Sequence, residues 1–145
     1  MECVHFETGF PEQQLMAQIL RLHEEIFEDS ATLIEKAKHK HKILFSVGIE
    51  KEEVVGYKIG YEMKPDIFYS WLGGVNKIHR HQGIASKLMN EQHSHLKSKG
   101  YKTVQTKTKN KWRNMLILNI RCGFNVVGIE TDQQCEPKII LEKKL

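Results

Sequence analysis

The sequence predicts an α/β (α+β) domain with a mixed, mostly antiparallel sheet of about six to seven strands, flanked by about four helices. Two observations lead to this prediction. The chain has 145 residues, of which 40% are apolar and 28% charged, and this size and composition suit one hydrophobic core. Segments rich in β-branched and aromatic residues alternate with segments whose apolar residues recur at helical spacing. No linker or repeat interrupts them, so residues 1–145 are expected to form a single domain.

The N-terminal part is expected to form one strand and two helices. Val4–Thr8 is predicted as the strand, and Pro11 suits the first turn of the helix that follows. Apolar residues recur along this helix at intervals of three and four, at Leu15, Ile19, Leu22 and Ile26. Thr32 followed by Glu35 matches the capping box that starts many helices. Ser30 can also cap this helix, so the second helix is expected to begin near Ser30 or Thr32 and to end near His39.

The remainder of the chain is expected to alternate strands and helices and to close as a hairpin. Strands are predicted at Ile43–Ile49, Val54–Met63, Ile67–Val75, Tyr101–Thr108, Val126–Thr131 and Lys138–Leu145. Helices are predicted at Gly83–Ser98 and Lys111–Arg121, each with a glycine just after it that favours a helix end. The strand that ends in Gly73-Gly74 is unusual because glycine weakens a strand. The pair predicts either a bulge or the close approach of another group to the backbone.

Several classes of protein are excluded by composition. No apolar run approaches the roughly 18 residues that a membrane span needs. The first residues lack the basic-then-apolar layout of a secretion signal, so a cytoplasmic location is expected. Three cysteines without CxxC spacing predict neither a disulfide framework nor a cysteine-built zinc site. The three His-x-His pairs place their histidines poorly for sharing one ion, and no metal site is expected.

Charge is segregated along the chain. Residues 1–35 contain eight carboxylates and one arginine, whereas residues 92–129 contain eight basic residues and no acid. Such segregation predicts one region that attracts cations and another that attracts anions.

The segment Arg80–Ser86 lies between a predicted strand and a predicted helix. A helix N-terminus exposes unpaired backbone N–H groups and the positive end of the helix dipole, which together bind anions. Gly83 and Ala85 are small enough to let a phosphate approach these groups. The segment is therefore predicted to bind a phosphate-bearing ligand.

Two motifs resemble those of one family. Arg80-x-x-Gly83-x-Ala85 matches the R/Q-x-x-G-x-G/A motif of the GNAT superfamily of acyl-CoA-dependent N-acyltransferases. Asn114 followed by Arg121–Phe124 resembles the helix ending in Gly-Phe that precedes the last strands of that family. The order of predicted elements also resembles the GNAT topology over nearly the whole chain.

The resemblance implies an N-acetyltransferase that binds acetyl-CoA as cosubstrate and moves the acetyl group to a primary amine by direct attack in a ternary complex. It implies that the loop holds the pyrophosphate through Arg80, His81, Gln82, Gly83, Ile84, Ala85 and Ser86. The pantetheine arm would bind at the end of the preceding strand, at Gly73, Gly74 and Val75, and be reached by Asn114. A homodimer through the last strands is also common in the family.

The catalytic residues are less well defined. Many family members carry a tyrosine, the general acid for the leaving thiolate, at the position of Asn119, and an amide cannot act as such an acid. The strand leading to the loop also lacks a carboxylate that could serve as the base. Glu62 and Tyr69 are the nearest candidates, and either could act through a water molecule.

Three functions remain open at this point. In the first, the acidic N-terminal region, which by resemblance shapes the acceptor pocket, attracts a cationic amine. In the second, the missing tyrosine and carboxylate indicate a catalytically silent CoA-binding domain that senses or interacts. The third, a nucleic-acid binder that uses the basic stretch, is disfavoured by the modest net charge of +4.

Overall fold

Seven strands form one sheet in the computed structural model, which describes residues 1–7 and 9–145. The strands are β1 (Glu2–Glu7), β2 (Leu44–Glu50), β3 (Glu53–Lys64), β4 (Ile67–Val75), β5 (Thr103–Lys109), β6 (Asn125–Thr131) and β7 (Pro137–Lys144). The helices are α1 (Gln13–Phe27), α2 (Ser30–Ala37), α3 (Ile84–Ser98) and α4 (Arg113–Arg121), with a 3₁₀ turn, η1, at Lys77–His79. In space the strands follow the order β1-β2-β3-β4-β5-β7-β6.

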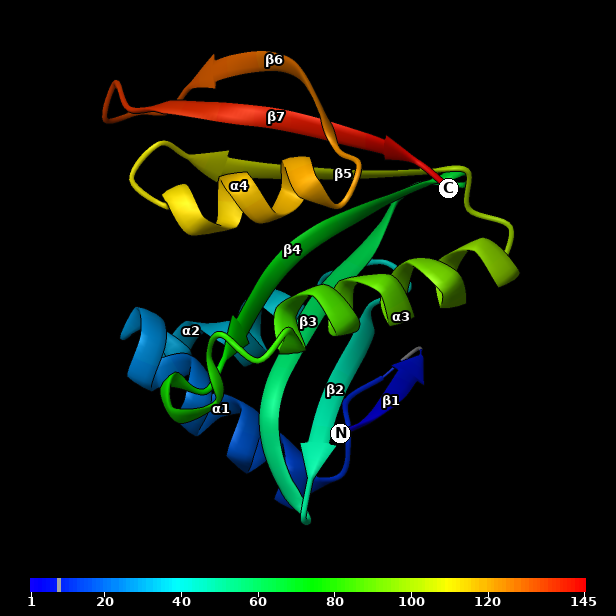
Figure 1. Cartoon of the computed structure of the whole chain (residues 1–145), viewed down its shortest axis with the longest axis vertical. Coiled ribbons are helices and arrows are strands. Elements are labelled where there is room, and N and C mark those ends of the chain that lie inside the picture. Colours follow the sequence, from blue (N-terminus) through cyan, green and yellow to red (C-terminus); the bar gives the residue numbers. More distant parts are fainter. Residues whose placement is uncertain (8) are drawn as a thin grey trace.

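Helices cover both faces of the sheet, with α3 and α4 in front and α1 and α2 behind in Figure 1. The core behind the sheet joins Ile19 and Leu22 of α1 to Phe45, Tyr57 and Ile59. The core in front joins buried residues of α3 to the central strands, to β7 and to the residue before β6, at Leu44, Phe68, Met89, Leu96, Val104, Phe124, Ile139 and Leu141. Alternation along each strand supplies both cores, because successive side chains point to opposite faces.

The predicted fold class and the order of the eleven predicted elements are confirmed, but some local predictions are wrong. The expected capping box at Thr32 is absent, because α2 begins at Ser30 and the Thr32 hydroxyl donates to the Asp29 carbonyl at 3.1 Å. Glu35 forms an ion pair with Lys38 at 3.5 Å instead. The first strand begins earlier than expected and is described to Glu7, and Thr8 lies outside the described residues.

The sheet changes character between β4 and β5, which form its parallel pair. Their pairing runs from Ile67–Thr103 to Ser70–Thr106 and ends there, although β4 continues to Val75 and stays paired with β3. The Thr106 hydroxyl donates to the Ser70 carbonyl at 3.0 Å and so fastens the last paired position. Beyond it the two strands diverge (Figure 1). Residues 71–75 therefore have no strand neighbour on the β5 side.

The bulge and the close approach predicted for Gly73-Gly74 occur at separate positions. The β3–β4 register shifts between Ile59, opposite Leu72, and Gly60, opposite Ser70, so Trp71 is the extra residue. The close approach occurs at Gly74, where a β-carbon would lie 2.5 Å from Cδ1 of Ile26. The glycine is thus needed for the packing of α1 against β4.

Apolar side chains remain exposed on the edge strand β6, at Val126, Val127 and Ile129, and on α4, at Ile117 and Ile120. An exposed apolar edge strand is suited to pairing with another chain. A homodimer through the last strands stays a prediction. Within the described part of the chain, no helix is long and apolar enough to cross a membrane.

Gly60 offers a test of packing beside the bulge. A β-carbon at this position would lie 2.3 Å from the Phe68 ring and 2.5 Å from the Tyr69 carbonyl oxygen. We expect Gly60→Ala to lower the free energy of unfolding by about 1–3 kcal/mol, because overpacking forces the neighbours to shift. Gly128→Ala is the matched control, since its nearest neighbour would be an ordinary 3.7 Å away. Chemical denaturation measures both, and equal losses of stability would contradict the described packing.

Candidate functional site

The connection from β4 to α3 presents a row of unbonded backbone amides. At its start, the Asn76 amide donates to the Val55 carbonyl at 2.8 Å, and the Asn76 side chain accepts from the Ile78 amide at 3.0 Å. At its end, the amide of Lys87 donates to the Gly83 carbonyl at 3.0 Å. Within residues 1–7 and 9–145, the amides of residues 81–86 between these points have no protein acceptor. They are available to an anion.

The backbone of this loop explains the choice of glycine. His81 and Gly83 both have left-handed conformations, with φ of 65° and 77°. A β-carbon at Gly83 would meet nothing within 4 Å, so the glycine serves the conformation rather than the packing. Residues of this kind in a turn direct successive N–H groups to one side and form an anion-binding concavity. The Arg80 side chain is held at the loop by its Nε, which donates to the Val75 carbonyl at 3.3 Å.

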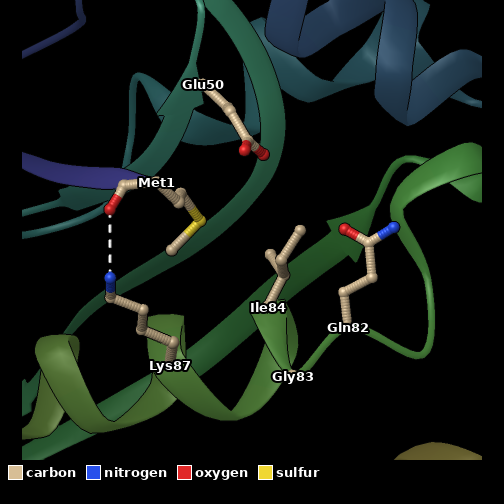
Figure 2. Close-up of a pocket in the computed structure, with 6 residues that line it drawn as sticks. All are labelled: Met1, Glu50, Gln82, Gly83, Ile84 and Lys87. Atoms are coloured by element: carbon tan, nitrogen blue, oxygen red, sulfur yellow. Dashed lines mark hydrogen bonds between the residues drawn. The ribbon is translucent and has the colours of Figure 1, made fainter.

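A hollow of about 220 Å³ lies beside the start of α3 and is lined by Met1, Glu50, Gln82, Gly83, Ile84 and Lys87. Figure 2 shows Lys87 donating to the Met1 carbonyl, at 3.0 Å, on one side and Gln82 on the other. The hollow opens toward the ends of β1 and β2 and carries the Glu50 carboxylate. This carboxylate would repel a phosphate, so the hollow is less suited to an anion than the unbonded loop amides are.

The diverging end of β4 lies next to this loop. Gly73, Gly74 and Val75 lead through Asn76 into η1, and this part of β4 has a paired strand on the β3 side alone. Asn114 is the exposed second residue of α4. At the start of the same helix, the Trp112 ring packs edge-on against Phe27 of α1, with centroids 6.0 Å apart. The structure therefore places the loop and the free strand end in succession, while Asn114 stands on a separate element.

Of the two catalytic candidates, Glu62 is far from the diverging strands. It lies opposite Phe68, near the start of β4. Its carboxylate accepts from the Tyr101 hydroxyl at 2.9 Å and pairs with His41 at 3.1 Å and with Lys42 at 3.8 Å. These partners engage the carboxylate near the start of β4, and a catalytic role for Glu62 stays a prediction.

Tyr69 lies one residue before the point where the β4–β5 pairing ends. Its ring lies 5.3 Å from the ring of Tyr61, on the face covered by α1 and α2. Burial is the main cause that raises the pKa of Tyr69 to about 12. The phenol therefore stays protonated near neutral pH, where it can donate a hydrogen bond but cannot serve as a ready base.

A buried chain of hydrogen bonds on the same face was not predicted from the sequence. His23 Nε2 donates to the Asp29 carboxylate at 2.5 Å, and the Tyr57 hydroxyl donates to His23 Nδ1 at 2.5 Å. Burial and the Asp29 charge raise the pKa of Tyr57, which keeps the phenol protonated as this role requires. Tyr57 Oη would lie 3.4 Å from a β-carbon on Gly74. The signal in the sequence was a histidine beside the apolar stripe of α1.

A hollow of about 50 Å³ adjoins this chain, between α1, α2 and β4. Its lining residues are His23, Asp29, Thr32, Leu33, Lys36, Trp71 and Leu72. Next to it the ammonium of Lys40 lies 4.7 Å from the Tyr61 ring centroid and 5.0 Å from that of Trp71. The aromatic pair thus already holds one cation, as electron-rich ring faces do.

The sequence matches the model of one known protein family. The model of the acetyltransferase (GNAT) family matches residues 11–124, which include the β4–α3 loop, the diverging strands and α4. The chain belongs to the GNAT family of acetyltransferases. This GNAT protein is accordingly an acyltransferase. No curated protein sequence matches it.

Solved GNAT structures share the fold over nearly the whole chain. An aminoglycoside 6'-N-acetyltransferase complexed with coenzyme A has a TM-score of 0.81 and 15% identity, covering 99% of this chain and 97% of its own. A GNAT family acetyltransferase from Elizabethkingia anophelis with acetyl-CoA bound has a TM-score of 0.76 and 18% identity, covering 99% and 98%. The ribosomal-protein-S18-alanine N-acetyltransferase from Escherichia coli has a TM-score of 0.76 and 13% identity, covering 97% and 94%.

Many GNAT proteins carry a tyrosine at the position that Asn119 occupies in this GNAT protein, and Asn119 is buried. Asn119 is buried, with 3% of its surface exposed, on the side of α4 that packs on the sheet. Its backbone carbonyl accepts from the Phe124 amide at 3.0 Å. Because an amide side chain has no proton to give near neutral pH, Asn119 cannot act as a general acid, and a reaction at this site would either need no acid or take one from another element.

Glu62 can be tested directly. We expect Glu62→Gln to leave kcat within about twofold of the wild type, because the carboxylate lies away from the diverging strands, while the loss of its two ion pairs lowers stability by about 1 kcal/mol. The amide still accepts from Tyr101. Steady-state kinetics and thermal unfolding on the same preparation check both effects. A fall in kcat of about a hundredfold would return Glu62 to the role of general base.

Proposed function

We propose that this GNAT protein transfers an acetyl group from acetyl-CoA to a cationic primary amine by direct attack in a ternary complex. The carrying observation is the row of six free amides, at residues 81–86, next to a strand end that has lost its neighbour. A pyrophosphate needs several converging donors, and an extended pantetheine arm needs a free strand edge. These two features occur here in succession.

In this proposal the chain performs two binding tasks on acetyl-CoA. The loop amides from His81 to Ser86, with Arg80 beside them, hold the pyrophosphate. The free backbone groups of residues 72–75 hold the pantetheine arm and polarise the thioester carbonyl, because preorganised N–H donors stabilise the oxyanion that forms during attack. The glycines at 73 and 74 leave the strand edge unobstructed. The solved relatives described as complexed with coenzyme A or bound to acetyl-CoA support this cosubstrate.

The face covered by α1 and α2 supports a cationic acceptor. Glu24, Glu25 and Glu28 are exposed on or just after α1, and Asp29 lines the small hollow against Trp71. The Tyr61–Trp71 pair already holds the Lys40 ammonium. Carboxylates and aromatic faces both favour a positively charged group. The acceptors named for the relatives, aminoglycosides and a ribosomal protein, differ in size. The proposal of a cationic acceptor therefore rests on the electrostatic field of this face and not on the shared fold.

The alternative is a catalytically silent CoA-binding domain, and Asn119 is the observation that favours it. Release of free CoA thiol in the presence of a panel of primary amines separates the two functions. Turnover of any amine above the background rate supports the enzyme. Binding of acetyl-CoA without turnover of any amine supports the silent domain.

The anion site is tested by a pair of substitutions at Gly83. Asparagine and aspartate both tolerate the left-handed backbone better than other residues do, and they differ mainly in charge. We expect Gly83→Asp to weaken acetyl-CoA binding at least about tenfold relative to Gly83→Asn, because a carboxylate would face the pyrophosphate. Calorimetry measures both, with circular dichroism to confirm folding. Equal affinities for the two variants would place the pyrophosphate elsewhere.

The acceptor is tested by reversing charge on α1. We expect Glu24→Lys, Glu25→Lys and Glu28→Lys together to raise the KM for the best cationic amine, because they replace attraction with repulsion. The increase should be about one order of magnitude at low salt and smaller at higher salt, since salt screens the interaction. The KM for acetyl-CoA is the internal control and should not change. An unchanged KM for the amine would show that these carboxylates do not attract the acceptor.

A further inference from the structure

Lys58 is an inward-facing lysine in the middle of β3. Its neighbours Tyr57 and Ile59 are fully buried on the face covered by α1 and α2. Because side chains alternate along a strand, Lys58 points to the opposite face, under α3 and α4. It stands directly opposite Gly73 of β4.

The side chain of Lys58 lies across Gly73. A β-carbon at Gly73 would be 3.5 Å from Cγ of Lys58 and 3.8 Å from its Nζ. Since Gly73 has no side chain, the lysine passes over β4 at the position where β4 and β5 have already separated (Figure 1). The Nζ atom is thus carried to the strand segment that the proposed function assigns to the pantetheine arm.

The Lys58 ammonium has no hydrogen bond or ion pair with residues 1–7 or 9–145. Desolvation lowers its pKa to about 8, and the Cys122 thiol partly opposes this shift. Lys58 is half-buried, and a partly desolvated charge without a partner is costly to a fold, so its presence calls for a functional explanation.

Among residues 1–7 and 9–145, no carboxylate is a resolved cause of the shift in the pKa of Lys58. Cys122 faces it from the end of α4, and His93 faces it from α3. Burial and the charges of Lys143 and Lys58 lower the pKa of His93 to about 3. The imidazole is therefore neutral, and its Nδ1 accepts from Lys143 of β7 at 3.1 Å. The cluster combines two lysines with a neutral imidazole and suits a negative charge that forms only during the reaction.

We propose that Lys58 is the proton donor for the leaving thiolate of CoA, in place of the acid that Asn119 cannot supply. This inference rests on the proposed function. The acceptor amine first loses a proton to water, and its neutral nitrogen then attacks the thioester carbonyl carbon and forms the new C–N bond. The C–S bond breaks, and its electron pair goes to sulfur. Sulfur takes a proton from Nζ of Lys58 and leaves as the thiol. The neutral Lys58 amine regains a proton from water, and the acceptor nitrogen loses its extra proton to water.

The charge state of Lys58 gives the proposal a distinct pH dependence. The ammonium carries its proton below pH 8 and loses it above, because the lowered pKa is about 8. The donor role therefore predicts that kcat, measured with saturating amine, falls as the pH rises through about 8. Cys122, His93 and Lys143 do not predict this limb, since none of them lies across Gly73.

Three variants and two readouts test the proposal. Lys58→Met keeps the side-chain length without the proton, Lys58→Arg keeps a charge that does not dissociate, and Lys143→Met removes the neighbouring lysine as a control. The first readout is the pH profile of kcat. The second is the pKa of the thiol of bound CoA, followed by thiolate absorbance, which needs no acceptor amine. Calorimetry with acetyl-CoA and thermal unfolding confirm binding and folding.

We expect Lys58→Met to bind acetyl-CoA, to unfold at or above the wild-type temperature, and to lower kcat at least about tenfold without the alkaline limb. The thiol pKa of bound CoA should rise in this variant. Lys58→Arg should recover part of kcat, also without the limb, and Lys143→Met should retain the limb.

A wild-type pH profile in Lys58→Met would overturn the donor role and leave the acetyltransferase intact. Acetylated Lys58, found by mass spectrometry after incubation with acetyl-CoA, would overturn it as well, because the amine would then act as a nucleophile. A wild-type protein that turns over no amine would overturn the proposed function and this inference with it.

Discussion

The end of the pairing between β4 and β5 is the constraint on which the site depends. Up to Ser70 and Thr106 the strands satisfy each other's backbone groups, and beyond them β4 keeps only its bonds to β3. A polar backbone edge left inside a domain is costly unless something pairs with it. The bulge at Trp71 accompanies the separation, since bulges bend a strand and increase its twist. The free edge is thus a built feature, and an extended ligand arm is its natural partner.

The separation also organises the two sides of the site. On the face of α3 and α4, the free edge leads directly into the loop amides and receives the Lys58 side chain over Gly73. On the face of α1 and α2, it meets the packing of Ile26 on Gly74 and the Tyr57–His23–Asp29 chain. Two adjacent glycines therefore serve opposite faces of one strand. A side chain at either position would alter a different half of the site.

The sequence was informative where structure is local. Helical and strand periodicity predicted the order of the elements, and the small residues around Gly83 predicted a loop with free amides before α3. Both depend on neighbours within a few residues. It was misleading at Thr32, where hydrogen bonding to Asp29 replaced a cap. It could not place Glu62 relative to the diverging strands, because that distance depends on the length and register of β3 and β4.

By itself the sequence determined the fold class, the position of the loop before α3 and the GNAT resemblance, because each depends on residues that lie close together along the chain. Only the tertiary structure decided which distant side chains meet. Lys58 and Gly73 are opposite one another through strand register, and His23, Asp29 and Tyr57 meet through the packing of α1 on β3. The physical reason is that strand register and helix packing are set by the whole core. The core places Lys58 across Gly73, which has no side chain, and it places His23 beside Asp29 and Tyr57. Neither neighbour can be read from the residues next to Lys58 or His23 in the sequence.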